Sequence, residues 1–330
     1  MRKAYGRDMD RETGKKMDRK TEGKTEGKIS RLDRIKGNSY AAAGAMGWGI
    51  SGVCSQYLFS EYQLDSGWLT AVRMILSGIL LLGIVFFRDG RQIFGVVKDG
   101  RDRLWLLAFA VLGLLYCQYS FLAAIAASNS GTATILQSLN VVMMAVVMAV
   151  WNRTGIGGRQ AAAMVLAVAG TYLVATHGNP SAMMLSPAGL AWGLSAAAGV
   201  VTYTLLSRPI VGRWGNLAVT GWGMLIGGAV LGLGIQVWQI PGNIDPFGAL
   251  MIAVIVIIGT AAGFSLFLQG IRYIGPVKAT LIGCLEPAAA TLLSAVFLGT
   301  RFGMMEMLGF AAILGTVFLS MGVSKKDAGT

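Results

Sequence analysis

The feature that most constrains this chain is a succession of ten apolar stretches, each close to the roughly 20 residues that a helix needs to cross a bilayer. The loops between them are too short to form a soluble core of their own. A helix satisfies its backbone hydrogen bonds internally, which a segment in lipid must do. We therefore predict an all-α integral membrane protein, with spans at 40–59, 67–87, 104–125, 130–151, 158–176, 187–206, 217–237, 247–271, 277–298 and 303–322.

The distribution of positive charge predicts how these spans are oriented. If the N-terminus is cytosolic, all but two of the 28 lysines and arginines fall in predicted cytosolic segments, the exceptions being Arg73 and Arg301. The positive-inside rule then places both termini in the cytosol and the chain in the inner (plasma) membrane. Residues 1–37, which are rich in charge, are expected to form a disordered cytosolic tail. The net charge of +12 therefore reports topology and not binding to nucleic acid.

Several kinds of chemistry lack the residues that they need. Cys54, Cys117 and Cys284 have neither paired nor metal-ligand spacing, and His177 is the only histidine. We therefore expect no metal site and no Ser/His/Asp hydrolase chemistry. Gly47 to Gly52 match G-x-G-x-x-G, but this run lies inside an apolar helix without a preceding strand, so no dinucleotide cofactor is expected. No Walker lysine is present either.

The chain divides into two similar halves, 38–177 and 186–323. Five spans are an odd number, so the second half would enter the membrane from the opposite side, as in an inverted-repeat transporter. The overlay pairs Trp48-Gly49-Ile50-Ser51 with Trp192-Gly193-Leu194-Ser195, Gly113 with Gly259, Ser138-Leu139-Asn140 with Cys284-Leu285-Glu286, and Gly170-Thr171 with Gly315-Thr316.

Residues 40–322 resemble the drug/metabolite transporter superfamily, EamA type. The most specific similarity is carried by Tyr273, Ala279, Leu285-Glu286-Pro287, Leu298-Gly299, Gly309 and Gly315, with Arg73 in the second span. The resemblance implies two EamA-like five-helix repeats and transport of a small metabolite. The chain departs from the family pattern at Thr300, at Trp151-Asn152-Arg153, and at Asn140-Val141, where a proline-containing pair is usual.

Glu286 is the most informative single residue, because it places a carboxylate near the centre of the bilayer. A charged group there must be neutralised, paired or in contact with a wet cavity. We interpret Glu286 as a coupling group or a ligand for a cationic substrate group, and a structural carboxyl is the alternative. Pro287 follows directly and predicts a bend in the helix.

Other polar and aromatic residues within the spans are candidates for the same pathway. Arg73 could extend outward to the interface, pair with Glu286, or bind a substrate carboxylate. Each of the others could equally form an interhelical hydrogen bond. The predicted cavity residues are Trp48, Gln118, Tyr119, Gln137, Asn140, Trp192, Tyr203 and Gln269, together with Gln56 and Tyr57.

The sequence thus predicts a secondary transporter that moves a small metabolite by alternating access, with export as the expected direction. An amino acid, a related compound or a drug-like cation would suit the cavity, and protons could be coupled through Glu286. The lipid bilayer and a small-molecule substrate are the expected partners, and a homodimer is left open. The alternative is an intramembrane enzyme acting on a lipid or isoprenoid, which the lack of a metal or nucleophile set disfavours.

Overall fold

The computed structural model describes residues 31–151, 153, 157–179, 184–241, 244–274, 279 and 282–321, and every regular element among them is helical. Short segments η1 (Gly90–Phe94) and α4 (Gly95–Lys98) connect two of the spans. The spanning units in chain order are α2 (Arg31–Glu61), α3 (Ser66–Asp89), α5 (Gly100–Ala108) continued by η2 (Phe109–Leu115) and α6 (Tyr116–Ala127), α7 (Ser130–Gln137) with α8 (Asn140–Trp151), α9 (Gly158–Thr176), α10 (Pro187–Trp214), α11 (Asn216–Ile235), α12 (Pro246–Val256) continued by η3 (Ile257–Ala262) and α13 (Gly263–Ile274), α15 (Leu285–Leu298), and α16 (Met304–Met321).

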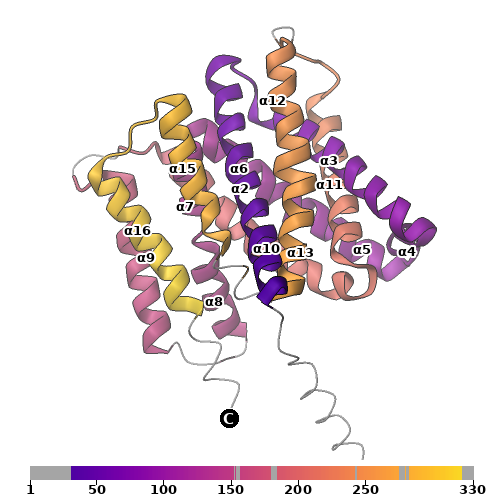
Figure 1. Ribbon diagram of the computed structural model, residues 1–330, viewed down its shortest axis with the longest axis horizontal. Coiled ribbons are helices and arrows are strands. Elements are labelled where there is room, and N and C mark those ends of the chain that lie inside the picture. Colours follow the sequence, from indigo (N-terminus) through magenta and orange to yellow (C-terminus); the bar gives the residue numbers. More distant parts are fainter. Residues whose placement is uncertain are drawn as a thin grey trace, which may run out of the picture.

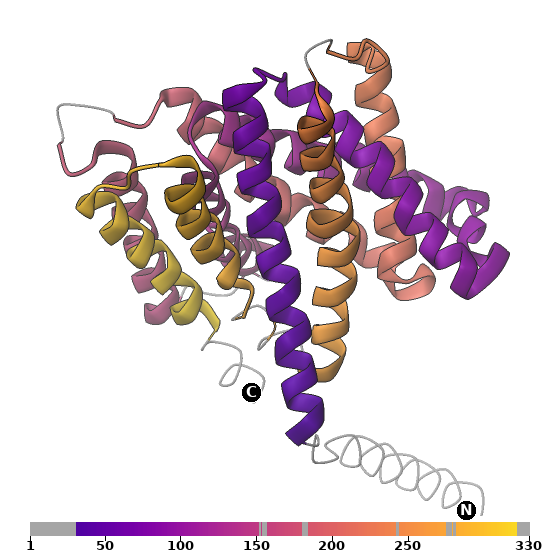
Figure 2. The same ribbon diagram turned by 45° about the horizontal axis from the view of Figure 1, so that its top comes forward.

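Length and composition identify most of these units as membrane helices. Within the described residues, six helical segments are long and apolar enough to cross a membrane, and three shorter apolar helices accompany them. Helix α2 has 31 residues, which is ample for a span, but its glycines and polar side chains lower its hydropathy. Helix α2 begins and α16 ends on the same side of the bundle (Figures 1 and 2), as an even number of spans requires.

The contacts between helices form the same pattern when the first and second halves of the chain are exchanged. Helix α2 packs against η3, α13 and α15, and its counterpart α10 packs against η2, α6, α7 and α8, of which α8 is the counterpart of α15. The two remaining pairs are α3 with α11 and α9 with α16. Each pair joins equivalent helices of the two halves, so the exchange leaves it unchanged. The pair α9 and α16 lies on one side of the bundle and the pair α3 and α11 toward the other, with α2, α10, α12 and α13 between them (Figure 1). Apart from Arg73 on α3, all of the predicted cavity residues lie on helices outside these two pairs.

The structure corrects one part of the sequence overlay. Gly113 faces Tyr203, because an added Cβ on Gly113 would lie 2.8 Å from the Tyr203 Cα, and Gly259 faces Ser51, with 2.1 Å to its Cβ. Since Gly113 and Gly259 are equivalent, Tyr203 corresponds to Ser51, and therefore Val200 corresponds to Trp48. Trp192, in the Trp-Gly pair of α10, lies eight residues before Val200, which is about 12 Å along the helix. Close glycine contacts, and not the repeated dipeptide, set the register.

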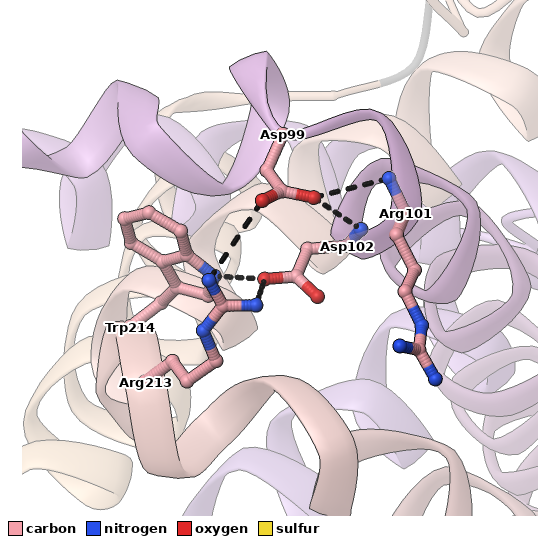
Figure 3. Close-up of polar contacts among 5 residues, drawn as sticks. All are labelled: Asp99, Arg101, Asp102, Arg213 and Trp214. Carbon is pink, nitrogen blue, oxygen red and sulfur yellow. Dashed lines mark hydrogen bonds and ion pairs between the residues drawn. The ribbon is translucent and has the colours of Figure 1, made fainter.

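A polar cluster joins the beginning of α5 to the end of α10 (Figure 3). Asp102 is 4% exposed and accepts hydrogen bonds from Arg213 Nη1 at 2.6 Å and Trp214 Nε1 at 2.7 Å. Asp99 caps α5 by accepting from the backbone N–H groups of Asp102 and Arg101. The cluster fixes the first half to the second on the side where α2 begins.

The Asp99 carboxylate has a lowered pKa, mainly because the Asp102 backbone N–H donates to it, with further help from Arg101 and Arg213. A lowered folded-state pKa means that this capping contribution is present above the ordinary Asp value. It is lost as the pH falls through the lowered value.

Two glycines of α3 provide a test of helix packing. A Cβ on Gly78 would lie 2.6 Å from the Leu225 backbone N, whereas one on Gly83 would meet nothing within 4 Å. We expect Gly78→Ala to lower the free energy of unfolding by about 1 to 3 kcal/mol through overpacking between α3 and α11. Gly83→Ala should be neutral or stabilising, because alanine favours a helix. Thermal unfolding in detergent would measure both, and equal melting temperatures would contradict this packing.

The polar cluster gives a second test. Asp102→Ala leaves the Arg213 guanidinium and the Trp214 N–H without their shared acceptor, so we expect a loss of about 1 to 3 kcal/mol in the free energy of unfolding. Asp89→Ala is the matched control, because the Asp89 side chain is 37% exposed and pairs only with its neighbour Arg88. A loss in the control as large as that in Asp102→Ala would show that the cluster does not fasten α5 to α10.

Candidate functional site

A cavity of about 110 Å³ lies among the central helices, where the two halves of the chain meet. It contains one positive and one negative side chain, several polar groups, and an apolar wall. Seven of the spanning units contribute to it. The lining residues are Trp48, Arg73, Leu114, Cys117, Gln118, Phe121, Gln137, Val200, Tyr203, Phe264 and Glu286.

Glu286 reaches the cavity from the beginning of a helix. The chain makes a turn at Cys284, α15 starts at Leu285, and Glu286 lies in the first turn of α15. The positive end of the helix dipole favours a carboxylate at this position. The expected bend at Pro287 is replaced by an interruption before it. Proline belongs naturally to the first turn, where its missing N–H leaves no helical hydrogen bond unmade.

The fourth span is interrupted at the equivalent place in the first half. Helix α7 ends at Gln137 and α8 begins at Asn140. The Asn140 side-chain amide donates to the Gln137 carbonyl at 2.7 Å, so it closes the interruption locally and does not line the cavity. Gln137 does line it, and its side-chain amide is 3.8 Å from the Cys117 sulfur.

Arg73 is positioned by a π-helical segment on another span. Widening of the helix at η3 lets the Thr260 hydroxyl donate to the Ile255 carbonyl, five residues earlier, at 3.1 Å. The same hydroxyl accepts a hydrogen bond from Arg73 Nε at 3.3 Å. Arg73 is only 5% exposed, so it does not extend to the membrane interface. A second π segment, η2, lies at the equivalent place in the first half, and such segments often occur at functional sites.

Arg73 and Glu286 face the same cavity without forming an ion pair between described residues. Neither side chain has another charged partner in the described part of the chain. The cavity therefore keeps two opposite charges apart, with room between them.

Trp48 supplies an unused hydrogen-bond donor at this site. Its Nε1 is buried and has no partner among the described residues. The ring packs on Phe264 and Phe267, with centroid distances of 5.3 and 4.8 Å. Gly263 allows this position, because a Cβ there would lie 2.8 Å from Trp48 Nε1.

Six of the sequence-predicted residues lie outside the cavity lining. Two of them are Gln56, whose side-chain amide donates to the Thr300 hydroxyl, and Tyr57, whose ring packs on Tyr62 and Phe247. Trp192 and Tyr119 pack edge to face, with ring centroids 5.5 Å apart, and Trp192 borders a separate apolar cluster. Asn140 closes the interruption of its own span, and Gln269 is half-buried in α13. Six predicted residues do come together, namely Trp48, Arg73, Gln118, Gln137, Tyr203 and Glu286.

Some lining residues were not predicted from the sequence. Leu114, Cys117, Phe121, Val200 and Phe264 are apolar or weakly polar, like most residues of the spans, so their residue type carries no signal. Thr260 is also new as the support of Arg73. The only available hint was Gly259 beside it, since glycine in an apolar helix often marks a close contact.

Another carboxylate within the membrane helices, that of Glu306, belongs to a different part of the protein. Glu306 is 5% exposed, accepts from the Thr132 hydroxyl at 2.9 Å and lies 3.5 Å from His177 Nε2. Glu306 is not among the residues that line the cavity between Arg73 and Glu286. Glu306 therefore serves as a natural comparison for Glu286.

Comparison with known proteins gives consistent matches over most of the chain. The model of the EamA-like transporter family matches residues 35–176 and 187–322. The uncharacterized inner membrane transporter YicL of Salmonella typhimurium is 36% identical over 89% of this chain and 97% of its own length. The WAT1-related protein At3g02690 of Arabidopsis thaliana is 25% identical over 76% of this chain and 61% of its own. A solved crystal structure with 15% identity shares the fold, with a TM-score of 0.60 over 89% of this chain and 99% of that one.

Thr260 provides a test of how Arg73 is held. Thr260→Val keeps the shape but removes the hydroxyl, so the buried guanidinium loses its acceptor, and we expect about 1 to 3 kcal/mol lower free energy of unfolding. Thr260→Ser should restore most of it. Thr316→Val is the matched control, because Thr316 is fully buried and its hydroxyl donates only to the Ile313 carbonyl of its own helix. Similar melting temperatures for both valine variants would contradict this role of Thr260.

Proposed function

We propose that this chain, which belongs to the EamA-like transporter family, carries a small polar or amphipathic metabolite across the inner membrane by alternating access. Members of the family are membrane transporters, so the intramembrane enzyme that the sequence left as an alternative does not apply. The proposal concerns the substrate, the path and the mechanism. The observation that carries it is the cavity between the two halves, which contains both Arg73 and Glu286.

The position of the cavity supports alternating access. Its lining comes from both halves, so a rocking motion of one half against the other would change which side can reach it. Hydrogen bonds between the halves are found on both sides. Gln56 donates to the Thr300 hydroxyl at 3.0 Å on one side, and Arg213 donates to Asp102 on the other (Figure 3). We infer that these two sets of contacts break in turn.

We assign the two repeats to 38–177 and 186–323 and both termini to the cytosol. The excess of lysine and arginine in the connecting segments supports this orientation. Export is the direction that we propose, with an amino acid, a related compound or a drug-like cation as substrate. The transporting unit in this proposal is one chain, since one chain builds the whole cavity.

Glu286 is the residue through which we propose coupling to protons. A carboxylate in a low-dielectric cavity is stabilised either by a proton or by a cationic group of the substrate. Binding of one would therefore displace the other, and each would cross the membrane in exchange. Because the proton and the substrate compete for one carboxylate, this form of coupling requires no separate proton-binding site.

The test is counterflow in proteoliposomes, with amino acids, nucleobases and organic cations, at two pH values on either side of neutrality. We expect saturable exchange that depends on pH in the wild type, and exchange that is slow and independent of pH in Glu286→Gln. Glu306→Gln is the matched control, because it removes a buried carboxylate that does not line the cavity, and it should keep the pH dependence. Intact, pH-dependent exchange in Glu286→Gln would rule out coupling through Glu286.

A further inference from the structure

The charges of the cavity define its substrate more narrowly than the fold does. Resting on the proposed transport function, we propose that the substrate is a small zwitterion, with its carboxylate bound by Arg73 and its ammonium group bound by Glu286. Among the residues that the structure describes, these two are the only charged side chains that line the cavity. They come from α3 in the first half and α15 in the second half.

The guanidinium of Arg73 is prepared for a carboxylate. Thr260 holds Nε, and no other hydrogen bond to Arg73 is found among the described residues, so both terminal nitrogens are available for a ligand. A guanidinium and a carboxylate match in a planar arrangement of two hydrogen bonds. The unpartnered Trp48 Nε1 adds a donor that also suits an anionic oxygen.

Glu286 is prepared for a group that donates hydrogen bonds. Its carboxylate accepts no hydrogen bond from the residues that the structure describes. Glu306 differs in this respect, because it accepts a hydrogen bond from Thr132 and lies beside His177. An ammonium group carries three donors and a full positive charge. It would satisfy the carboxylate in a way that the neutral side chains of Gln118 and Tyr203 do not.

Electrostatics favours a zwitterion over a simple ion. Burying a charge that lacks a partner costs several kcal/mol. A cation would neutralise Glu286 and leave Arg73 unpaired, and an anion would do the reverse. A zwitterion pairs both, and it adds no net charge to the site as it crosses the membrane. Direct contact between Arg73 and Glu286 would also pair the charges, but the structure keeps them apart.

The rest of the cavity limits the substrate to a small molecule with an apolar part. Leu114, Phe121, Val200 and Phe264 form the wall beside the charged groups. The volume of about 110 Å³ suits a compact molecule. We therefore expect α-amino acids with short apolar side chains to fit best.

The experiment uses matched compounds that differ only in charge. Proteoliposomes containing the full chain are loaded with each of the L-amino acids in turn, and counterflow of the labelled compound is measured. For the amino acid that exchanges fastest, the decarboxylated amine and the deaminated acid are then added as competitors. We expect the amino acid to compete about tenfold or more better than either analogue, because each analogue leaves one buried charge unpaired.

Charge-neutral variants should shift this preference in opposite directions. Arg73→Gln no longer needs a carboxylate, so the amine should become the better competitor, and Glu286→Gln should favour the acid in the same way. Arg73→Lys keeps the charge and should retain the preference for the amino acid at lower affinity. Size-exclusion profiles of all variants identify any that do not fold, and Arg73→Lys keeps the test valid if Arg73→Gln fails.

Three results would each support or overturn the zwitterion site. Preferential exchange of an amino acid, with opposite shifts in the two variants, supports the zwitterion site. Saturable exchange of organic cations or anions, or equal competition by the amine in the wild type, overturns it while leaving the carrier function intact. Absence of exchange for every compound in both panels overturns the transport proposal itself and this inference with it.

Discussion

The structure depends on how charged side chains are held at the depth of a membrane. Arg73 and Glu286 would each cost several kcal/mol if they were ionised and in contact with lipid. The fold solves this by directing both into one internal cavity, and by using irregular helices to do so. The π segment η3 places the Thr260 hydroxyl against Arg73, and the interruption at Cys284 places Glu286 in the first turn of α15.

These irregularities are repeated in the two halves, although the chemistry is not. The π segments η2 and η3 occupy equivalent places, as do the interruptions before α8 and α15. Yet the equivalent of Glu286 is Asn140, whose amide is used within its own span. The repeat supplies a symmetric scaffold of ten spans, and one charged residue in each half, Arg73 in α3 and Glu286 in α15, gives the cavity its charges. An EamA-family transporter can therefore change substrate without changing fold.

The sequence predicted the fold well because its main signals are local. Apolar length identifies a span without reference to any other part of the chain, and Gly113 and Gly259, which the overlay paired, both lie in π segments. The candidate site was predicted only in part. Trp48 and Trp192 share a Trp-Gly dipeptide, but packing equates Trp48 with Val200, and Trp192 packs against Tyr119. For Arg73, the sequence left three directions open, because a long flexible side chain can reach either the interface or the interior.

What the sequence determined by itself was the class of protein, the number of spans and the presence of a carboxylate within the ninth. These follow from the cost of exposing backbone and charge to lipid, which each segment meets on its own. Only the tertiary structure decided which polar residues converge. Convergence depends on the rotation and the register of each helix, and these are set by contacts such as Gly263 on Trp48 and Gly113 on Tyr203. Such contacts join residues that are far apart in the chain, so no local pattern can specify them.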